Sequence, residues 1–273
     1  MWHRIYADFL MPDRLGIYES LLRTALGHSY EIHSIHSFWQ RIQDGDRLPP
    51  TSRYLILRHD VDTDASTAER MWAVERKLGV KSTFYFRLST LAPNLMRAMQ
   101  ASGSEASYHY EELATVASRI SPSKADVIYE QMSVIRQLFK TNLFRLRREL
   151  GLPLLTVASH GDFMNRKLGI ANTAILADQE FRREVGIELE AYDAALNQHV
   201  TDRFADRQYP DYWSPDDPAT AIHRGSRVIL ILTHPRQWRA APSENAVDDM
   251  IRLWRGARYF VARHRFWSTE AGC

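Results

Sequence analysis

The sequence predicts an α/β protein with a mostly parallel sheet. Short apolar runs that are rich in β-branched and aromatic residues alternate along the chain with segments whose apolar residues recur every three or four positions. The most apolar short run, Val-Ile-Leu-Ile-Leu at 228–232, has the composition of a buried strand. Strands that alternate with helices form parallel sheets. Periodicity alone does not distinguish an open doubly wound sheet from a closed barrel.

Turn and cap residues set the limits of the expected elements. Gly79 and Gly151 follow helical patterns as stop signals, and Pro93 suits the first turn of a helix. Ser66 and Glu69 have the spacing of a capping box. We expect strands at residues 54–58, 82–88, 105–108, 154–158, 186–192 and 228–233, and helices at 66–78, 128–150, 172–183 and 247–261, with another that begins near 93.

Length and composition indicate one globular domain. The chain has 273 residues, of which 45% are hydrophobic and 25% charged, and this excludes a disordered chain, a collagen and a disulfide-rich miniprotein. We expect a single domain over residues 1–273, in which residues 1–50 form a helical preamble. The Leu-Pro-Pro-Thr-Ser segment at 48–52 is then a loop, because the residues before it are few for a separate core.

Charge and cysteine content limit the partners and the compartment. The formal net charge is +2, from 35 Lys and Arg against 33 Asp and Glu, which argues against a nucleic-acid partner. The one cysteine, Cys273, forms no internal disulfide, so a reducing compartment is expected. The N-terminal residues are charged from the start, and no apolar run approaches the ~20 residues of a membrane span. We therefore expect a cytoplasmic protein.

Side chains that can do chemistry follow the ends of the expected strands. In α/β folds the active site forms at the carboxyl ends of the strands, so the repeated placement is more informative than any single residue. The residues that share this placement are His59, Asp60, Asp62, His109, His160, Tyr192, Asp193 and His234.

The densest cluster is Arg-His-Asp-Val-Asp at 58–62. Residues two apart on a strand point the same way, so Asp60 and Asp62 are expected to face one pocket. One carboxylate can bind a divalent metal while the other stays free as a base for a water on that metal. The alternative is a loop in which Asp60 bonds backbone amides and Asp62 or Asp64 caps the next helix.

The three histidines that follow strands have both chemical and structural interpretations. His109 and His160 are candidate metal ligands through imidazole nitrogen, and Gly161 indicates a tight turn or a close ligand approach. His234 comes directly after the most apolar strand and is a candidate general acid. The alternative for each of the three is a hydrogen-bonded imidazole with a structural function, which is the more common state of a single histidine.

The motifs in this order resemble the polysaccharide deacetylase superfamily, and more closely a branch found among surface-polysaccharide biosynthesis proteins. The resemblance spans roughly residues 50–240. It rests on Arg-His-Asp-Val-Asp at 58–62, Lys-Ser-Thr-Phe-Tyr-Phe-Arg at 81–87, residues 105–112, Ser-His-Gly at 159–161, Glu-Ala-Tyr-Asp at 190–193 and Leu-Thr-His-Pro-Arg-Gln-Trp at 232–238.

The resemblance implies a distorted (β/α)7 barrel and a metal-dependent hydrolase that removes N- or O-linked acetyl groups from a sugar or polysaccharide precursor. Zinc is the first choice among divalent metals. By position, Asp60 is the implied base, Asp62 and His109 are implied metal ligands, and His234 is the implied acid. Side chains in or beside these motifs are expected to bind the acetylated sugar or glycan: Arg87, Tyr192, Trp213 and Trp238.

One departure from the family pattern concerns the metal. The family has a second histidine four residues after the first, and position 113 here is Leu. A third ligand must come from elsewhere, with His160 as first choice and Glu111 as second. The alternative is a catalytically decayed relative that binds a glycan or a biosynthetic partner. The oligomeric state does not follow from the sequence.

Overall fold

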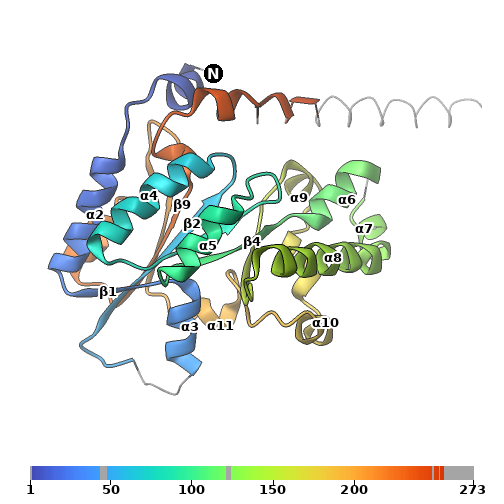
Figure 1. Cartoon of the computed structure of the whole chain (residues 1–273), viewed down its shortest axis with the longest axis horizontal. Helices are drawn as coiled ribbons and strands as arrows, with labels where there is room; N and C mark the ends of the chain where they lie inside the picture. Colours follow the sequence, from blue (N-terminus) through green and yellow to red (C-terminus); the bar gives the residue numbers. More distant parts are fainter. Residues whose placement is uncertain (1, 44–47, 121–123, 248, 252, 255–273) are drawn as a thin grey trace, which may run out of the picture.

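The computed structural model describes residues 2–43, 48–120, 124–247, 249–251 and 253–254, and contains a nine-stranded sheet covered by helices (Figure 1). Its strands are β1 (Tyr30–His33), β2 (Arg53–Val61), β3 (Thr83–Phe86), β4 (Glu105–Tyr110), β5 (Thr156–Ser159), β6 (Leu189–Glu190), β7 (Asp202–Asp206), β8 (Trp213–Ser214) and β9 (Val228–Thr233).

The helices fall between these strands. They are α1 (Trp2–Ile5), η1 (Tyr6–Leu10), α2 (Leu15–Gly27), α3 (Ile35–Gln43), α4 (Ala65–Leu78), α5 (Pro93–Ala101), α6 (Glu112–Ile120), α7 (Asp126–Glu130), α8 (Met132–Leu150), α9 (Phe163–Leu168), η2 (Asn172–Leu176), α10 (Gln179–Glu184), α11 (Ala194–Asn197), α12 (Pro218–Arg224) and η3 (Pro235–Gln237). In the described part of the chain, no helix has the length and apolar character that a membrane span requires.

Seven parallel strands form the barrel wall in the order β6-β5-β4-β3-β2-β9-β7. The wall is curled. Arg58 Nη2 on β2 donates a hydrogen bond of 3.1 Å to the hydroxyl of Tyr192, which lies just after β6 at the far end of this strand order. Across the described residues no ladder joins β6 to β7, which leaves a seam in the wall. The expected distorted (β/α)7 barrel is therefore confirmed by the strand order.

The inner face of β2 changes from apolar to polar along the strand. Tyr54 and Ile56 belong to the apolar cluster at the start of the barrel, and the next two residues with the same orientation are Arg58 and Asp60. Ile35 and Phe38 of α3 pack into this cluster, so the N-terminal extension closes the amino end of the barrel. Polar side chains are thereby left for the carboxyl ends of the strands, which we call the mouth.

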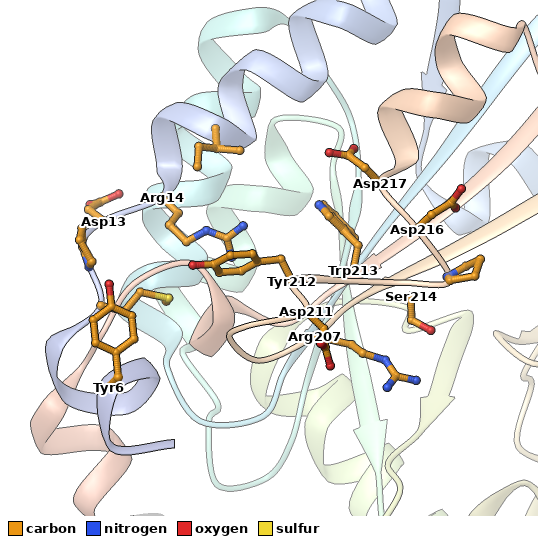
Figure 2. Close-up of a pocket in the computed structure, with 14 residues that line it drawn as sticks. Tyr6, Asp13, Arg14, Arg207, Asp211, Tyr212, Trp213, Ser214, Asp216 and Asp217 are labelled. Carbon is orange, nitrogen blue, oxygen red and sulfur yellow. The ribbon is translucent and has the colours of Figure 1, made fainter. Parts of the chain in front are cut away.

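The N-terminal extension also covers the outside of the wall. α2 contacts α4 and α12, and β1 adds a parallel strand to the first half of β2. The start of α2 lies against the hairpin of β7 and β8, where Arg14 stacks on the Tyr212 ring with 3.8 Å to the ring centroid (Figure 2). The expected helical preamble is thus present, with a short strand inside it.

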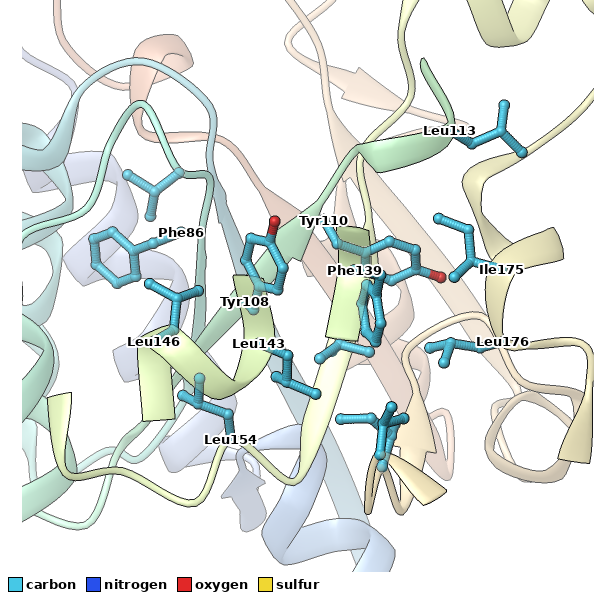
Figure 3. Close-up of a cluster of buried hydrophobic side chains, with 14 of the residues drawn as sticks. Phe86, Tyr108, Tyr110, Leu113, Phe139, Leu143, Leu146, Leu154, Ile175 and Leu176 are labelled. Carbon is cyan, nitrogen blue, oxygen red and sulfur yellow. The ribbon is translucent and has the colours of Figure 1, made fainter. Parts of the chain in front are cut away.

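The opposite side of the wall packs on α8. Tyr108 and Tyr110 of β4 point outward onto Phe139 of α8, with ring centroids 6.2 and 5.1 Å apart (Figure 3). Leu113, where the family pattern has histidine, is fully buried in this cluster and lies near Ile175. Since Tyr108 and Tyr110 face outward, His109 between them faces the interior of the barrel.

A fully buried polar group fixes the outer face of β2 to its neighbours. His59 Nε2 lies 2.7 Å from Glu75 Oε1 of α4, and His59 Nδ1 lies 2.5 Å from the Thr233 hydroxyl of β9. The Glu75 carboxylate also accepts hydrogen bonds from the Tyr18 hydroxyl of α2 and from the Ser82 hydroxyl. These contacts join α2, α4, β2 and β9 beneath the mouth.

Several expected elements differ in detail. Asp64, rather than Ser66, caps α4, because its carboxylate accepts the Thr67 backbone N–H at 2.9 Å. The expected helix at 172–183 is divided into η2 and α10, because Asp178 caps α10. The expected helix at 128–150 is divided at Gln131. The strand at 186–192 is reduced to β6, and the described residues from 242 to 254 are helical while the rest of the expected closing helix lies outside them.

Candidate active site

The end of β2 carries a buried ion pair. Arg58 Nε and Nη2 donate to the two carboxylate oxygens of Asp60 at 2.8 and 2.7 Å. Burial favours the neutral form of Asp60, but the charge of Arg58, supported by His109 and His234, keeps its pKa below the usual range. Asp60 is therefore an ionised carboxylate at neutral pH with a fixed orientation.

Asp62 lies between two histidines from neighbouring strands. Its Oδ1 atom is 3.4 Å from His109 Nε2 and 3.6 Å from His160 Nε2. Burial raises the pKa of Asp62, but His160 and His109 hold it well below the usual value. The sequence placed these three side chains at three strand ends, and the fold brings them together.

His109 is oriented by a backbone carbonyl. Its Nδ1 lies 2.9 Å from the Ala158 oxygen, which only accepts, so Nδ1 carries the proton and Nε2 faces Asp62 and Asp60. A histidine whose other nitrogen donates to a carbonyl is the usual arrangement of a metal ligand.

Glu111 and Arg87 support His160 from behind. His160 Nδ1 lies 3.1 Å from Glu111 Oε2, and Arg87 Nη2 donates to the same oxygen at 2.7 Å. Burial raises the pKa of Glu111, but His160 and Arg87 lower it to about 2. Arg87 Nη1 also donates to the Asp62 backbone oxygen at 3.2 Å, so it joins both sides of the cluster.

Two observations fit a cation in this cluster. Asp62 Oδ1 is buried and forms no hydrogen bond with any described residue. Two of the three ligand-atom separations, those of Asp62 Oδ1 from the two Nε2 atoms, are 3.4 and 3.6 Å, near the roughly 3.3 Å between ligand atoms of tetrahedral zinc with bonds of about 2.0–2.1 Å. Carboxylate and imidazole form a common zinc ligand set.

A second set of possible ligands shares His160. Glu111, His160 and Asp162 each offer an atom within 4.8 Å of the others. Asp162 is already committed to the capping box of α9, where its carboxylate accepts the Met164 N–H at 3.0 Å. Among the described residues, the second set is the one whose possible ligand atoms all lie within 4.8 Å of one another, whereas the first set faces Asp60. The two sets are competing positions to be tested.

His234, at the end of β9, is paired with an aspartate of β7. Its Nδ1 lies 2.7 Å from Asp206 Oδ1, and Asp206 Oδ2 accepts the His234 backbone N–H at 2.7 Å. Burial lowers the pKa of His234, but Asp206, supported by Asp62 and Asp60, raises it to about 10. Because 28% of the His234 side chain is exposed, this imidazolium is accessible from the mouth.

The four expected substrate contacts have different places. Tyr192 is 42% exposed and its ring lies 4.5 Å from the Arg58 guanidinium, at the mouth. Trp213 is half-buried on β8. Arg87 is buried beneath Glu111, and Trp238 is fully buried, where its indole N–H donates to Asp206 at 2.9 Å. Of these four, Tyr192 and Trp213 remain accessible to a ligand.

Sequence reasoning did not identify Asp206 or the function of Arg58. Asp206 ends a strand whose side chains are mostly half-exposed, and only Phe204 marks it as apolar, so the strand itself was not expected. The residues at 202–206, Asp-Arg-Phe-Ala-Asp, do not alternate between apolar and polar side chains, so no local pattern marked this strand. Arg58 was part of the quoted motif, and its position two residues before Asp60 on a strand was the signal for their pairing.

Comparisons with known proteins give no match by sequence: no family profile and no curated protein matches the chain. Two solved structures are similar in fold. The deacetylase PplD of Streptococcus pyogenes, solved in complex with acetate, is 12% identical over 56% of this chain and 67% of its own, with a TM-score of 0.39. IcaB of Ammonifex degensii is 13% identical over 67% of this chain and 79% of its own, with a TM-score of 0.45. One of the two is a deacetylase, the class that the sequence motifs resemble. Likenesses at these values carry no argument about activity, so function is argued from the site.

Proposed function

We propose that this chain is a metal-dependent hydrolase that removes an N- or O-linked acetyl group from a sugar or polysaccharide precursor. The observation that carries the proposal is that an ionised carboxylate, Asp60, and a protonated imidazole, His234, lie at the same mouth. Beside them is a cluster of side chains suited to a divalent cation: Asp62, His109 and His160. Acetyl hydrolysis needs these functions together: a base, an acid and electrostatic support for a developing oxyanion.

Asp60 is the proposed base. It takes a proton from a water molecule as the water oxygen attacks the acetyl carbonyl carbon. Arg58 holds both carboxylate oxygens, so Asp60 keeps its charge and its orientation. Asp62, His109 and His160 would hold a divalent cation, which would supply Lewis-acid polarisation of the carbonyl and increase the acidity of water.

His234 is the proposed acid. When the bond between the acetyl carbon and the sugar nitrogen or oxygen breaks, His234 Nε2 gives a proton to the departing atom, and the products are acetate and a free amine or hydroxyl. Asp206 holds Nδ1, which directs the other nitrogen toward the mouth. General acid and base assistance of this kind contributes about 10²–10⁴-fold each.

Tyr192 is the proposed substrate contact at the mouth, and Trp213 on β8 is a second proposed contact. Arg87 and Trp238 act through other residues, since they bond Glu111 and Asp206. Zinc is the proposed ion because the ligands are imidazole and carboxylate. The single cysteine supports the cytoplasm as the proposed compartment.

The metal content of the purified chain tests this proposal. Protein prepared without chelator or affinity metal is expected to hold about one divalent ion per chain by elemental analysis. Asp62→Ala and His109→Ala are expected to lose it. Asp162→Ser is the matched control, because serine also caps a helix but does not ligate zinc in this position.

The outcomes separate the alternatives. Metal that survives Asp62→Ala but not Asp162→Ser places the ion in the Glu111, His160 and Asp162 set. A chain that binds no ion, even after zinc and cobalt are offered, overturns the hydrolase proposal and favours a decayed relative that binds a glycan or a biosynthetic partner. Asp60→Asn is expected to keep the metal and lose most turnover, and full turnover in that variant would remove Asp60 as the base.

A further inference from the structure

A cavity of about 870 Å³ lies between the start of α2 and the hairpin of β7 and β8 (Figure 2). None of its lining residues is the proposed base, acid or a proposed metal ligand, although Trp213, a proposed substrate contact, is among them. Ligand cavities typically measure about 300–1,000 Å³. The space is therefore large enough for a ligand of more than one ring.

Part of the cavity wall is aromatic and held in place. Tyr212 has a φ of 59°, in the left-handed region that bulky residues rarely adopt. Its ring is covered by the Arg14 guanidinium, which also donates to the Gln237 backbone oxygen at 3.2 Å. On the other side, the Trp213 ring meets Trp238 at 5.6 Å between centroids. Such contacts on both sides keep the wall rigid.

The rest of the lining is predominantly acidic. The lining contains four aspartates, at 13, 211, 216 and 217, and two arginines, at 14 and 207. Asp13 and Asp217 each use one oxygen as a backbone acceptor at the start of a helix. The exposed side chains of Asp211 and Asp216 form no hydrogen bond with other residues in the described ranges. The cavity thus has net negative charge and free acceptor oxygens.

We propose that this cavity binds a de-N-acetylated amino sugar, a pyranose ring that carries a protonated primary amine. The apolar face of a pyranose packs on aromatic rings such as Tyr6 and Trp213, and an ammonium group is attracted both to carboxylates and to aromatic faces. The inference rests on the proposed function, since removal of an N-acetyl group from a sugar leaves an amine of this kind.

The cavity is close to the acid of the proposed reaction. Trp213 lies opposite Asp206 in the ladder of β7 and β8, and it contacts Trp238, which donates to Asp206. Asp206 in turn holds His234. A sugar that packs against Trp213 is therefore separated from the mouth by only a few side chains. In this position the cavity holds a glycan from which acetyl groups have already been removed.

Calorimetric titration with a glucosamine tetramer, and separately with its N-acetylated counterpart, tests the proposal. The acetylated tetramer is measured in Asp60→Asn so that it is not consumed. We expect the amine to bind more tightly, with an affinity that falls as salt is added. Asp211→Asn with Asp216→Asn is expected to weaken amine binding about fivefold, and Trp213→Ala about tenfold. Asp126→Asn, an exposed aspartate on α7, is the matched control and leaves binding unchanged.

Equal affinity for both tetramers overturns the amine specificity, and amine binding that none of the cavity variants weakens overturns the site. The two aspartate changes leave the aromatic wall intact, so they remain informative if Trp213→Ala disturbs folding. The amine tetramer carries no acetyl group, so its binding is independent of turnover. Failure of the hydrolase proposal appears instead in the metal content and in the activity of Asp60→Asn.

Discussion

Asp206 holds His234 by two contacts, one to the imidazole and one to the backbone. The Nδ1 to Oδ1 distance and the backbone N to Oδ2 distance are both 2.7 Å. The ring can therefore neither turn over nor move away from the end of β9. Trp238 donates to the same carboxylate, so Asp206 is itself fixed in position.

Replacing Asp206 with Asn is expected to shift the pH dependence of turnover. Burial lowers the pKa of His234 and Asp206 raises it to about 10, so the wild-type acid stays protonated until the pH approaches 10. Without that charge the pKa falls toward or below the ordinary value of about 6.5, and the alkaline limb of kcat moves to lower pH. Asp202→Asn, on the same strand, is the control. An unchanged alkaline limb in Asp206→Asn would exclude His234 as the acid.

Replacing Arg58 with Met is expected to disable the base without removing the metal. Burial then raises the pKa of Asp60 unopposed by the guanidinium, so the acid limb of kcat moves to higher pH and turnover at neutral pH falls about tenfold or more. Arg58→Lys restores part of the charge and part of the rate. The measurement is kcat against pH together with metal content, and loss of the ion in Arg58→Met would show that Arg58 supports the ligands instead.

Glu111→Gln is expected to weaken metal affinity rather than abolish binding. The Glu111 carboxylate lies behind His160 and accepts from Arg87, and loss of such an outer partner typically costs about 10–100-fold in affinity. Competition with a fluorescent zinc chelator measures the change, and the stoichiometry at saturating zinc is expected to remain one. Complete loss of zinc would instead identify Glu111 as a direct ligand.

The polar group around Glu75 is expected to dominate the stability of the wall. Glu75→Ala leaves His59 and Tyr18 buried without their shared acceptor, and breaking a buried pair of this kind costs about 3–5 kcal/mol. Urea unfolding of Glu75→Ala measures the loss. Glu69→Ala, exposed on the same helix, is expected to change the free energy of unfolding by no more than about 0.5 kcal/mol. Equal effects of the two variants would contradict the assignment.

The sequence predicted most of the wall because its strands are buried and its helices end in glycines. β2, β3, β4 and β9 lie where their apolar runs placed them. β7 was not expected, because it is half-exposed and has one strongly apolar residue. The divided helix at 172–183 depends on Asp178, whose side chain competes for backbone N–H groups, and periodicity does not detect that competition.

Of the candidate site, the sequence predicted the side chains that follow the strands but not the residues that orient them. Asp62, His109 and His160 each follow a strand, and the carboxyl ends of parallel strands meet at one edge of the sheet, so their proximity could be expected from the strand ends. The partners that orient them come from sequence-distant positions: Ala158 for His109, and Asp206 for His234. Which carbonyl or carboxylate faces which imidazole depends on strand register, and no local pattern in one sequence specifies register between strands.

Adjacent side chains of β2 have opposite neighbours. Arg58 and Asp60 face the barrel interior, while His59 between them faces Glu75 and Thr233. Both faces of this strand are therefore constrained. A change at Arg58 or Asp60 affects the proposed base, and a change at His59 loosens the attachment of α4 and β9. Relatives of this chain that change their chemistry are expected to do so by exchanging the loops around the mouth, while the residues at 58–60 stay as they are.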